Sequence, residues 1–145
     1  MKYLITIVLG MFLITSLEAQ VINVPKKSQN HFGKKYPSAK EVNWINNVTD
    51  YQVKFKDEKG TQRAYYHMDG TWNFTELYID NSKIPAEVNS SLSKSRFSDW
   101  TIESSAFIEN NKGKTMYRLE MKKGLEKKFV FYDKNGKEIK TSATT

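Results

Sequence analysis

Apolar and polar residues alternate through two long parts of the chain, and this period of two is typical of strands that bury one face. In residues 50–56, Tyr51, Val53 and Phe55 alternate with polar side chains, so the three face one side of a sheet. Such segments are bounded by turn residues and predict four strands in each part. Their ranges are Glu41–Asn46, Asp50–Lys56, Gln62–Met68, Thr71–Ile79, Trp100–Ile108, Lys114–Lys122, Glu126–Asp133 and Lys137–Thr141.

A helix is predicted before each group of strands. The second helix starts at Pro85, which suits a first turn because its missing N–H is not needed there. The first ends near residue 35, where Gly33 and Tyr36-Pro37 favour a stop. In each helix, residues spaced four positions apart lie along one face. They are Ile84, Val88 and Leu92 in the second helix, and Val24, Ser28 and Phe32 in the first.

The two parts match each other in order. Val24-Pro25 and Ile84-Pro85 stand sixty residues apart, whereas Tyr51 and Tyr117 stand sixty-six apart, because the polar stretch Glu109–Lys114 adds six residues. We interpret this as an internal duplication. The predicted fold class is α+β, with two tandem helix-plus-four-strand repeats, at about 24–80 and 84–141, that form one antiparallel sheet with the helices on one face.

The alternation also assigns residues to the two faces of the sheet. One face is predicted to be core and contains Ala64, Tyr66 and Met68, with Trp72 and Phe74 beside them. The other is left open and is the candidate binding surface, with Tyr65, His67, Arg118 and Tyr132. Asp69-Gly70, Asn135-Gly136 and Lys59-Gly60 are predicted to be hairpin turns of type I′.

The N-terminus has the pattern of a secretory signal peptide. Lys2 is followed by an uncharged, largely apolar run from Tyr3 to Leu17, and Ala19 is a small residue suited to the position before a cut. Residues 1–19 are therefore predicted to be removed, which leaves 126 of the 145 residues as a single domain, 20–145. The alternative is an uncleaved membrane anchor, but a helix that spans the bilayer core needs about 20 apolar residues, and this run is shorter.

Composition narrows the functional classes. The chain has no cysteine, so a disulfide framework, thiol catalysis and thiolate metal sites are all excluded. The formal net charge is +7, but the Lys residues are spread over turns and helix ends rather than gathered in one tract. Such a distribution suits a solvated surface or attraction to anionic envelope groups. No nucleic-acid motif is present, and nucleic acid is not an expected partner.

Candidate catalytic chemistry is sparse. The two histidines, His31 and His67, lie in different predicted elements and form no metal motif, so both are expected at the surface. No nucleophile elbow or phosphate loop occurs. Glu76, Glu103 and Glu120 lie inside strands, where a lone Glu is most often a surface charge or an ion-pair partner. We therefore expect no enzyme activity, no catalytic residue, no metal and no cofactor.

Six segments together resemble the PepSY-like, β-lactamase-inhibitor-protein-like family of small exported proteins best known in Bacteroidetes. They are the Val-Pro and Ile-Pro helix starts, Tyr36-Pro37-Ser38-Ala39, Val42-Asn43-Trp44, Tyr51-Gln52-Val53-Lys54-Phe55 and Asp69-Gly70-Thr71-Trp72. The resemblance extends from Val24 to about Lys140 and implies the tandem architecture described above. It also implies a binding role, since the β-lactamase inhibitor protein grips an enzyme with its exposed sheet face. No functional residue of that family is carried over.

The expected function is an exported, periplasmic or secreted, non-enzymatic binding module, with inhibition of a secreted or periplasmic enzyme such as a peptidase as the specific role considered. Its expected partner is a protein of the cell envelope or the medium, and no membrane anchor is expected after cleavage. The alternative is a sensor or binder of a small molecule or of an anionic envelope polymer. The sequence leaves the oligomeric state open.

Overall fold

A computed structural model describes residues 23–143, and the predicted signal peptide lies outside this range. All of the predicted helices and strands are found, with ends shifted by one or two residues. In chain order they are α1 (Lys26–Lys35), β1 (Lys40–Asn46), β2 (Asp50–Asp57), β3 (Gly60–His67), β4 (Trp72–Ile79), the short 3₁₀ helix η1 (Asn81–Lys83), α2 (Ala86–Ser93), β5 (Thr101–Asn110), β6 (Thr115–Lys123), β7 (Glu126–Tyr132) and β8 (Glu138–Ala143). No helix among residues 23–143 is long and apolar enough to cross a membrane.

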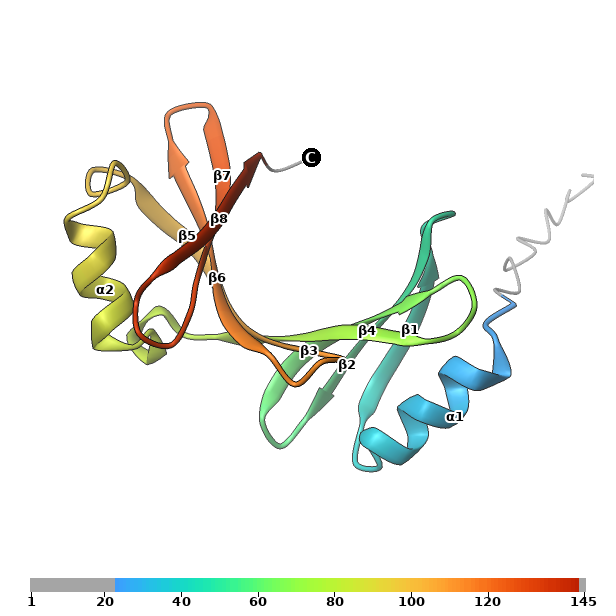
Figure 1. The fold of residues 1–145 in the computed structure, drawn as a ribbon. Helices are drawn as coiled ribbons and strands as arrows, with labels where there is room; N and C mark the ends of the chain where they lie inside the picture. The colour runs from blue at the N-terminus through green and yellow to red at the C-terminus, as the bar shows by residue number, and fades with distance from the viewer. Residues whose placement is uncertain (1–22, 144–145) are drawn as a thin grey trace, which may run out of the picture.

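The eight strands form one sheet in which each strand pairs with the next along the chain, and every pair is antiparallel. The predicted α+β class with an open antiparallel sheet is therefore confirmed. Figure 1 shows that the sheet bends strongly near its middle, so that the first four strands and the last four form two wings, with one helix on the outer side of each.

Both helices cover the same face of the sheet. Direct cross-strand partners point to the same side, and one continuous row of partners crosses from β2 to β7: Phe55, Gln62, Leu77, Phe107, Tyr117 and Tyr132. The β2 end of this row packs with α1 and the β7 end packs with α2. Within residues 23–143, no helix covers the opposite face in either wing.

The core consists of two separate hydrophobic clusters, one under each helix. Their helix residues have the predicted spacing of four, and Val88 and Ser28 are completely buried. The first cluster contains Val24, Phe32, Tyr51, Val53, Phe55, Ala64 and Tyr66. The second contains Ile84, Val88, Leu92, Phe97, Leu119, Met121, Val130 and Tyr132. Since each helix lies over its own wing, the strands between the wings rely on direct sheet pairing.

Tyr132 corrects the predicted open face. Its side chain is only 1% exposed and belongs to the cluster under α2. The reason is the register, because Tyr132 pairs directly with Tyr117 on the helix-covered side. In β7 both alternating rows are apolar, so the sequence pattern does not distinguish the two faces, and the residues that do lie on the open side are Phe129 and Phe131.

Two residues of the predicted core are also misplaced. Met68 is 46% exposed because β3 ends at His67 and Met68 lies in the turn. Phe74 lies on the open face because it pairs directly with Tyr65. A register shift in the β3–β4 pair leaves Trp72 opposite Tyr66 on the covered side and returns Phe74 to the other. Such a bulge adds one residue to a strand and breaks the simple alternation.

The predicted type I′ turns are wrong as well. That geometry needs positive φ at both central residues, and the only non-glycine residues with positive φ in the described chain are Glu41 and Val48. At the β3–β4 hairpin, the Gly70 N–H instead donates to the His67 carbonyl, and Gly70 alone has a φ of +81°. This is a three-residue loop that closes with a left-handed glycine.

Candidate binding surface

The open face is the side of the sheet opposite both helices, and its residues follow from the register. Tyr65 pairs with Phe74, and Arg118 pairs with both Ala106 and Phe131. His67 is exposed at the end of β3 on the same side. The structure therefore has Tyr65, His67 and Arg118 on the open face, as predicted, but not Tyr132.

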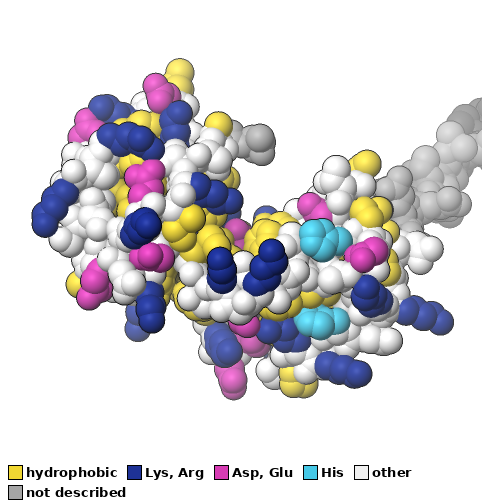
Figure 2. Space-filling model, viewed as in Figure 1, with side chains coloured by type: hydrophobic (Ala, Val, Ile, Leu, Met, Phe, Trp, Pro, Cys, Tyr) yellow, Lys and Arg dark blue, Asp and Glu magenta, His cyan; other side chains and the backbone are white. Residues whose placement is uncertain are grey.

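A hollow of about 360 Å³ lies at the centre of this face. Figure 2 shows the space between the two wings, with hydrophobic side chains along its floor and Lys or Arg side chains beside it. We call this feature the central hollow, and its lining residues all come from β4 to β8: Asn73, Phe74, Glu76, Ile108, Asn110, Met116, Arg118, Phe129, Phe131 and Lys140. It thus draws on both wings of the sheet.

A buried ion pair forms the floor of the central hollow. The Arg118 Nη1 atom lies 3.1 Å from Glu76 Oε1, and the two side chains are only 11% and 4% exposed. The Tyr65 hydroxyl, on β3 of the same wing as Glu76, donates to Glu76 Oε2 at 3.2 Å. Because Glu76 and Arg118 neutralise each other, the floor carries little net charge.

Burial sets the ionisation of this group of side chains. It raises the pKa of Glu76 above its usual value, since removal from water disfavours the carboxylate more than nearby Arg118 favours it. Burial, with a smaller effect of Glu76, also raises the pKa of Tyr65 to about 12. At neutral pH Tyr65 is therefore an uncharged hydrogen-bond donor.

Aromatic rings around the floor are paired with cations and with one another. The Arg118 guanidinium lies 4.6 Å from the centre of the Phe129 ring, and Lys140 Nζ lies 4.3 Å from that of Phe131. Tyr65 and Phe74 stack with their centres 4.3 Å apart. These contacts hold flat apolar surfaces and cationic groups side by side.

Sequence reasoning missed much of this surface. Phe74, Phe129, Phe131 and Lys140 were not among the predicted site residues, although all line the central hollow. Of the two predicted roles for a strand Glu, surface charge or ion-pair partner, Glu76 has the second and is buried. Glu103 and Glu120 are also ion-pair partners and pair with lysines.

The histidines do not approach each other. His67 is exposed on its strand, as predicted, whereas His31 is not a free helix-surface residue, because its Nδ1 is 3.0 Å from the Tyr66 hydroxyl and its ring stacks on Trp72. Within residues 23–143, no group of three His, Cys, Asp or Glu side chains is arranged to hold a metal ion.

Comparison with known proteins bears on the fold. The chain matches no protein-family model, and no curated protein is similar to it in sequence. Solved structures with a similar fold include a DUF2874 family protein from Bacteroides ovatus, with a TM-score of 0.74 and 21% identity over 83% of this chain and 87% of that chain. Another DUF2874 family protein, from Bacteroides uniformis, has a TM-score of 0.74 and 16% identity over 83% of this chain and 89% of that chain.

A BLIP-like protein from Bacteroides fragilis is similar to the same extent, with a TM-score of 0.74 and 16% identity over 87% of this chain and 90% of that chain. At such identities the similarity concerns the fold alone. It supports the inhibitor-protein-like part of the resemblance found in the sequence, whereas the PepSY-like part stays a prediction. This chain has a BLIP-like fold.

Proposed function

We propose that the protein is an exported, non-enzymatic binding module that binds a protein of the cell envelope or the medium through its open face. We further propose that it inhibits a secreted or periplasmic enzyme in this way, with a peptidase as the first class to test. The central hollow is the observation that carries this proposal. An uncovered face of an antiparallel sheet is usually polar, but this one gathers aromatic rings around a neutralised ion pair.

The composition of the hollow suits a protein partner. Interfaces are enriched in aromatic residues, Met and Arg, because these offer large contact areas with few rotatable bonds or with a polar tip. Phe74, Met116 and Phe129 line the hollow, and exposed Lys140 lies at its edge. The description of one structural neighbour as BLIP-like also supports a binding role. The basic and apolar run in residues 1–19 supports export.

Two pairs of matching contacts support an internal duplication as the origin of the two wings. Gln29 Nε2 donates to the Val24 carbonyl at 2.9 Å, and Asn89 Nδ2 donates to the Ile84 carbonyl at 3.2 Å. Both pairs stand sixty residues apart, as the helix starts do. We infer that a single helix-plus-four-strand unit was duplicated, and that binding between the wings became possible only after duplication.

The proposal is tested by capture from an envelope extract at low and high salt. Met116→Glu adds a charge to the hollow and should abolish capture of the partner. Leu125→Glu is the matched control, because Leu125 is fully exposed in the β6–β7 turn and should tolerate the same change. Both variants must unfold at the wild-type temperature for the comparison to count.

Capture that survives high salt and is lost only with Met116→Glu supports the proposal and identifies the partner. The alternative function, binding of a small molecule or an anionic envelope polymer, predicts capture that disappears at high salt, since exposed charges are screened. Equal capture by both variants would contradict the use of the open face.

A further inference from the structure

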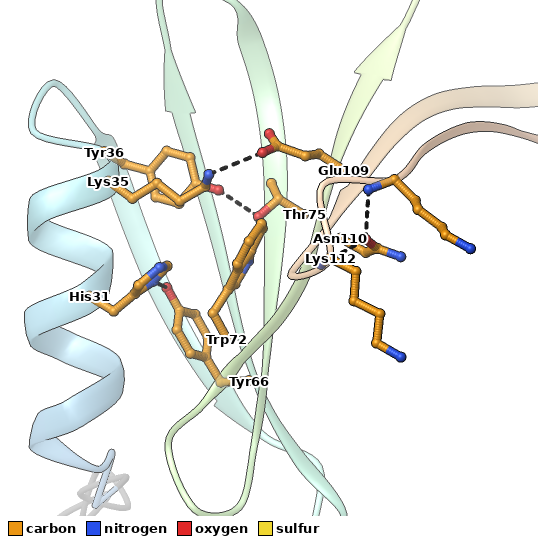
Figure 3. A network of polar contacts seen from close by, with 10 residues as sticks. His31, Lys35, Tyr36, Tyr66, Trp72, Thr75, Glu109, Asn110 and Lys112 are labelled. Atoms are coloured by element: carbon orange, nitrogen blue, oxygen red, sulfur yellow. Dashed lines mark hydrogen bonds and ion pairs between the residues drawn. The ribbon is translucent and has the colours of Figure 1, made fainter. Parts of the chain in front are cut away.

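A second pocket lies on the helix-covered face, away from the central hollow. It has a volume of about 290 Å³ and lies where the end of α1 approaches β4 and β5. Figure 3 shows one wall, where Lys35 and Tyr36 at the end of α1 lie opposite Thr75 and Glu109. Because α1 covers one wing and α2 the other, this pocket occupies part of the uncovered strip between them.

Gln62 is the unusual residue of this pocket. It is the one amide in the row that runs Phe55, Gln62, Leu77, Phe107 and Tyr117 across the sheet, and it is only 4% exposed. Its side-chain Nε2 has no hydrogen-bond partner among residues 23–143. A buried donor without a partner costs about 1–3 kcal/mol. A ligand that presents a carbonyl oxygen here would remove that cost.

The rest of the pocket selects against an anionic ligand. Leu77 and Phe107 supply apolar walls beside Gln62. The charged lining residues include three carboxylates and two ammonium groups: Asp57, Glu58, Glu109, Lys35 and Lys59. The C-terminal end of α1 adds partial negative charge. Although the whole chain has a net charge of +7, the lining of this pocket has one more carboxylate than ammonium groups and therefore disfavours an anionic group.

A polar extension continues from the pocket. Ser38, Asp57 and Glu58 line both this pocket and an adjoining depression that reaches β1. A hydroxyl and two carboxylates are groups that accept hydrogen bonds from the hydroxyls of a sugar. The site therefore combines a carbonyl-binding amide, a small apolar wall and a hydroxyl-binding edge.

We infer that this pocket binds a neutral N-acetylated amino sugar. The acetamido carbonyl accepts a hydrogen bond from Gln62, the methyl group packs against Leu77 and Phe107, and the ring hydroxyls donate to Asp57 and Glu58. This site is independent of the open face, so a protein bound in the central hollow and a sugar bound here would occupy opposite sides of the sheet.

The test is a titration of the ¹⁵N-labelled protein followed by NMR, with N-acetylglucosamine as the probe. We expect shifts of the Gln62 side-chain amide and of the Leu77 and Phe107 backbone amides. Glucose, which lacks the acetamido group, should cause none. N-acetylalanine methylamide, which has the amide but no sugar ring, should bind more weakly than N-acetylglucosamine.

Gln62→Met keeps the side-chain volume and removes the amide. It should fold at least as stably as the wild type, since an unpartnered buried donor is lost, and it should bind N-acetylglucosamine about tenfold more weakly, which corresponds to one hydrogen bond. Gln52→Met on the open face is the matched control and should bind normally. Equal shifts with glucose, stronger binding of the methylamide, unchanged binding by Gln62→Met, or no shift at all would each overturn the inference.

Discussion

The Asn111 side chain donates a hydrogen bond of 3.1 Å from Nδ2 to the carbonyl oxygen of Trp72. Its backbone N–H donates to the Asn73 carbonyl at 2.8 Å. Asn111 lies in the β5–β6 turn of the second wing, whereas Trp72 and Asn73 belong to β4 of the first. Beside them, Lys35 of α1 pairs with Glu109 at 3.5 Å (Figure 3). Residues 109–114, which change the spacing between the two parts, therefore connect the wings.

Asn111→Ala should weaken this connection. It removes one side-chain hydrogen bond, so the free energy of unfolding in urea should fall by about 1 kcal/mol. Amide hydrogen exchange in residues 72–74 should also become faster, because the turn no longer holds the start of β4. Lys112→Ala is the control, since the Lys112 backbone N–H, and not its side chain, bonds to Asn110. Equal losses in both variants would show that the turn does not couple the wings through Asn111.

The sequence predicted most of the fold because the fold depends on local periodicity. Strands such as β2, with strict alternation around Val53, were placed to within one residue. The open face was harder, because two of its aromatic residues lie where alternation carries no information and a register shift moves a third, Phe74, to the other side. In β7, Phe129 and Phe131 alternate with equally apolar Val130 and Tyr132, and only the register with β6 separates them. The central hollow depends on the bend of the sheet, which no single segment encodes.

Gly136→Ala should be strongly destabilising. A Cβ at Gly136 would overlap the carbonyl group of Glu87 and lie 2.7 Å from Ser91 Oγ, both on α2. The hairpin tip and the helix must separate to admit it, at a cost of several kcal/mol in addition to the cost of a φ of +79°. Thermal unfolding monitored by circular dichroism would measure the change.

Gly113→Ala is the matched control for that substitution. Gly113 has a similar φ of +69°, but a Cβ there would meet nothing within 4 Å. Gly113→Ala should therefore lose only about 1–2 kcal/mol of unfolding free energy, which is the cost of placing alanine at a positive φ. If the two variants unfold at the same temperature, the close approach of the β7–β8 hairpin to α2 is not a source of stability.

His31 should make the protein sensitive to mild acid. Burial, and to a lesser extent Lys35, lowers the pKa of His31 below its usual 6.5. A histidine with a lowered pKa in the folded state contributes stability that is complete above 6.5 and is lost as the pH falls through the folded-state pKa. Wild type should therefore lose more unfolding free energy than His31→Gln between about pH 7 and pH 5. Urea unfolding at each pH would measure this, and parallel curves would contradict it.

Arg118→Met should be among the most damaging single substitutions on the open face. It removes the cation beside a carboxylate that is only 4% exposed, and loss of one partner of a buried pair costs about 3–5 kcal/mol. Adding Glu76→Gln should restore most of that loss, because no buried charge then remains. Urea unfolding of the two single variants and the double variant forms a complete cycle. A double variant no more stable than Arg118→Met would mean that lost packing, not charge, causes the effect.

The pH dependence of Glu76→Gln tests the balance between burial and pairing. Because burial raises the pKa of Glu76 above 4.5 in the folded protein, the titration of Glu76 contributes stability that is complete below 4.5 and is lost as the pH rises through the folded-state pKa. Gln cannot titrate, so the wild type should become more stable relative to Glu76→Gln as the pH falls from neutral toward 4.5. The difference in unfolding free energy between the two proteins, measured in urea across that range, cancels the other carboxylates. A difference that moves the opposite way would mean that Arg118 and Tyr65 stabilise the carboxylate more than burial disfavours it, and that the floor of the central hollow is a strong ion pair at every pH above that of acid unfolding.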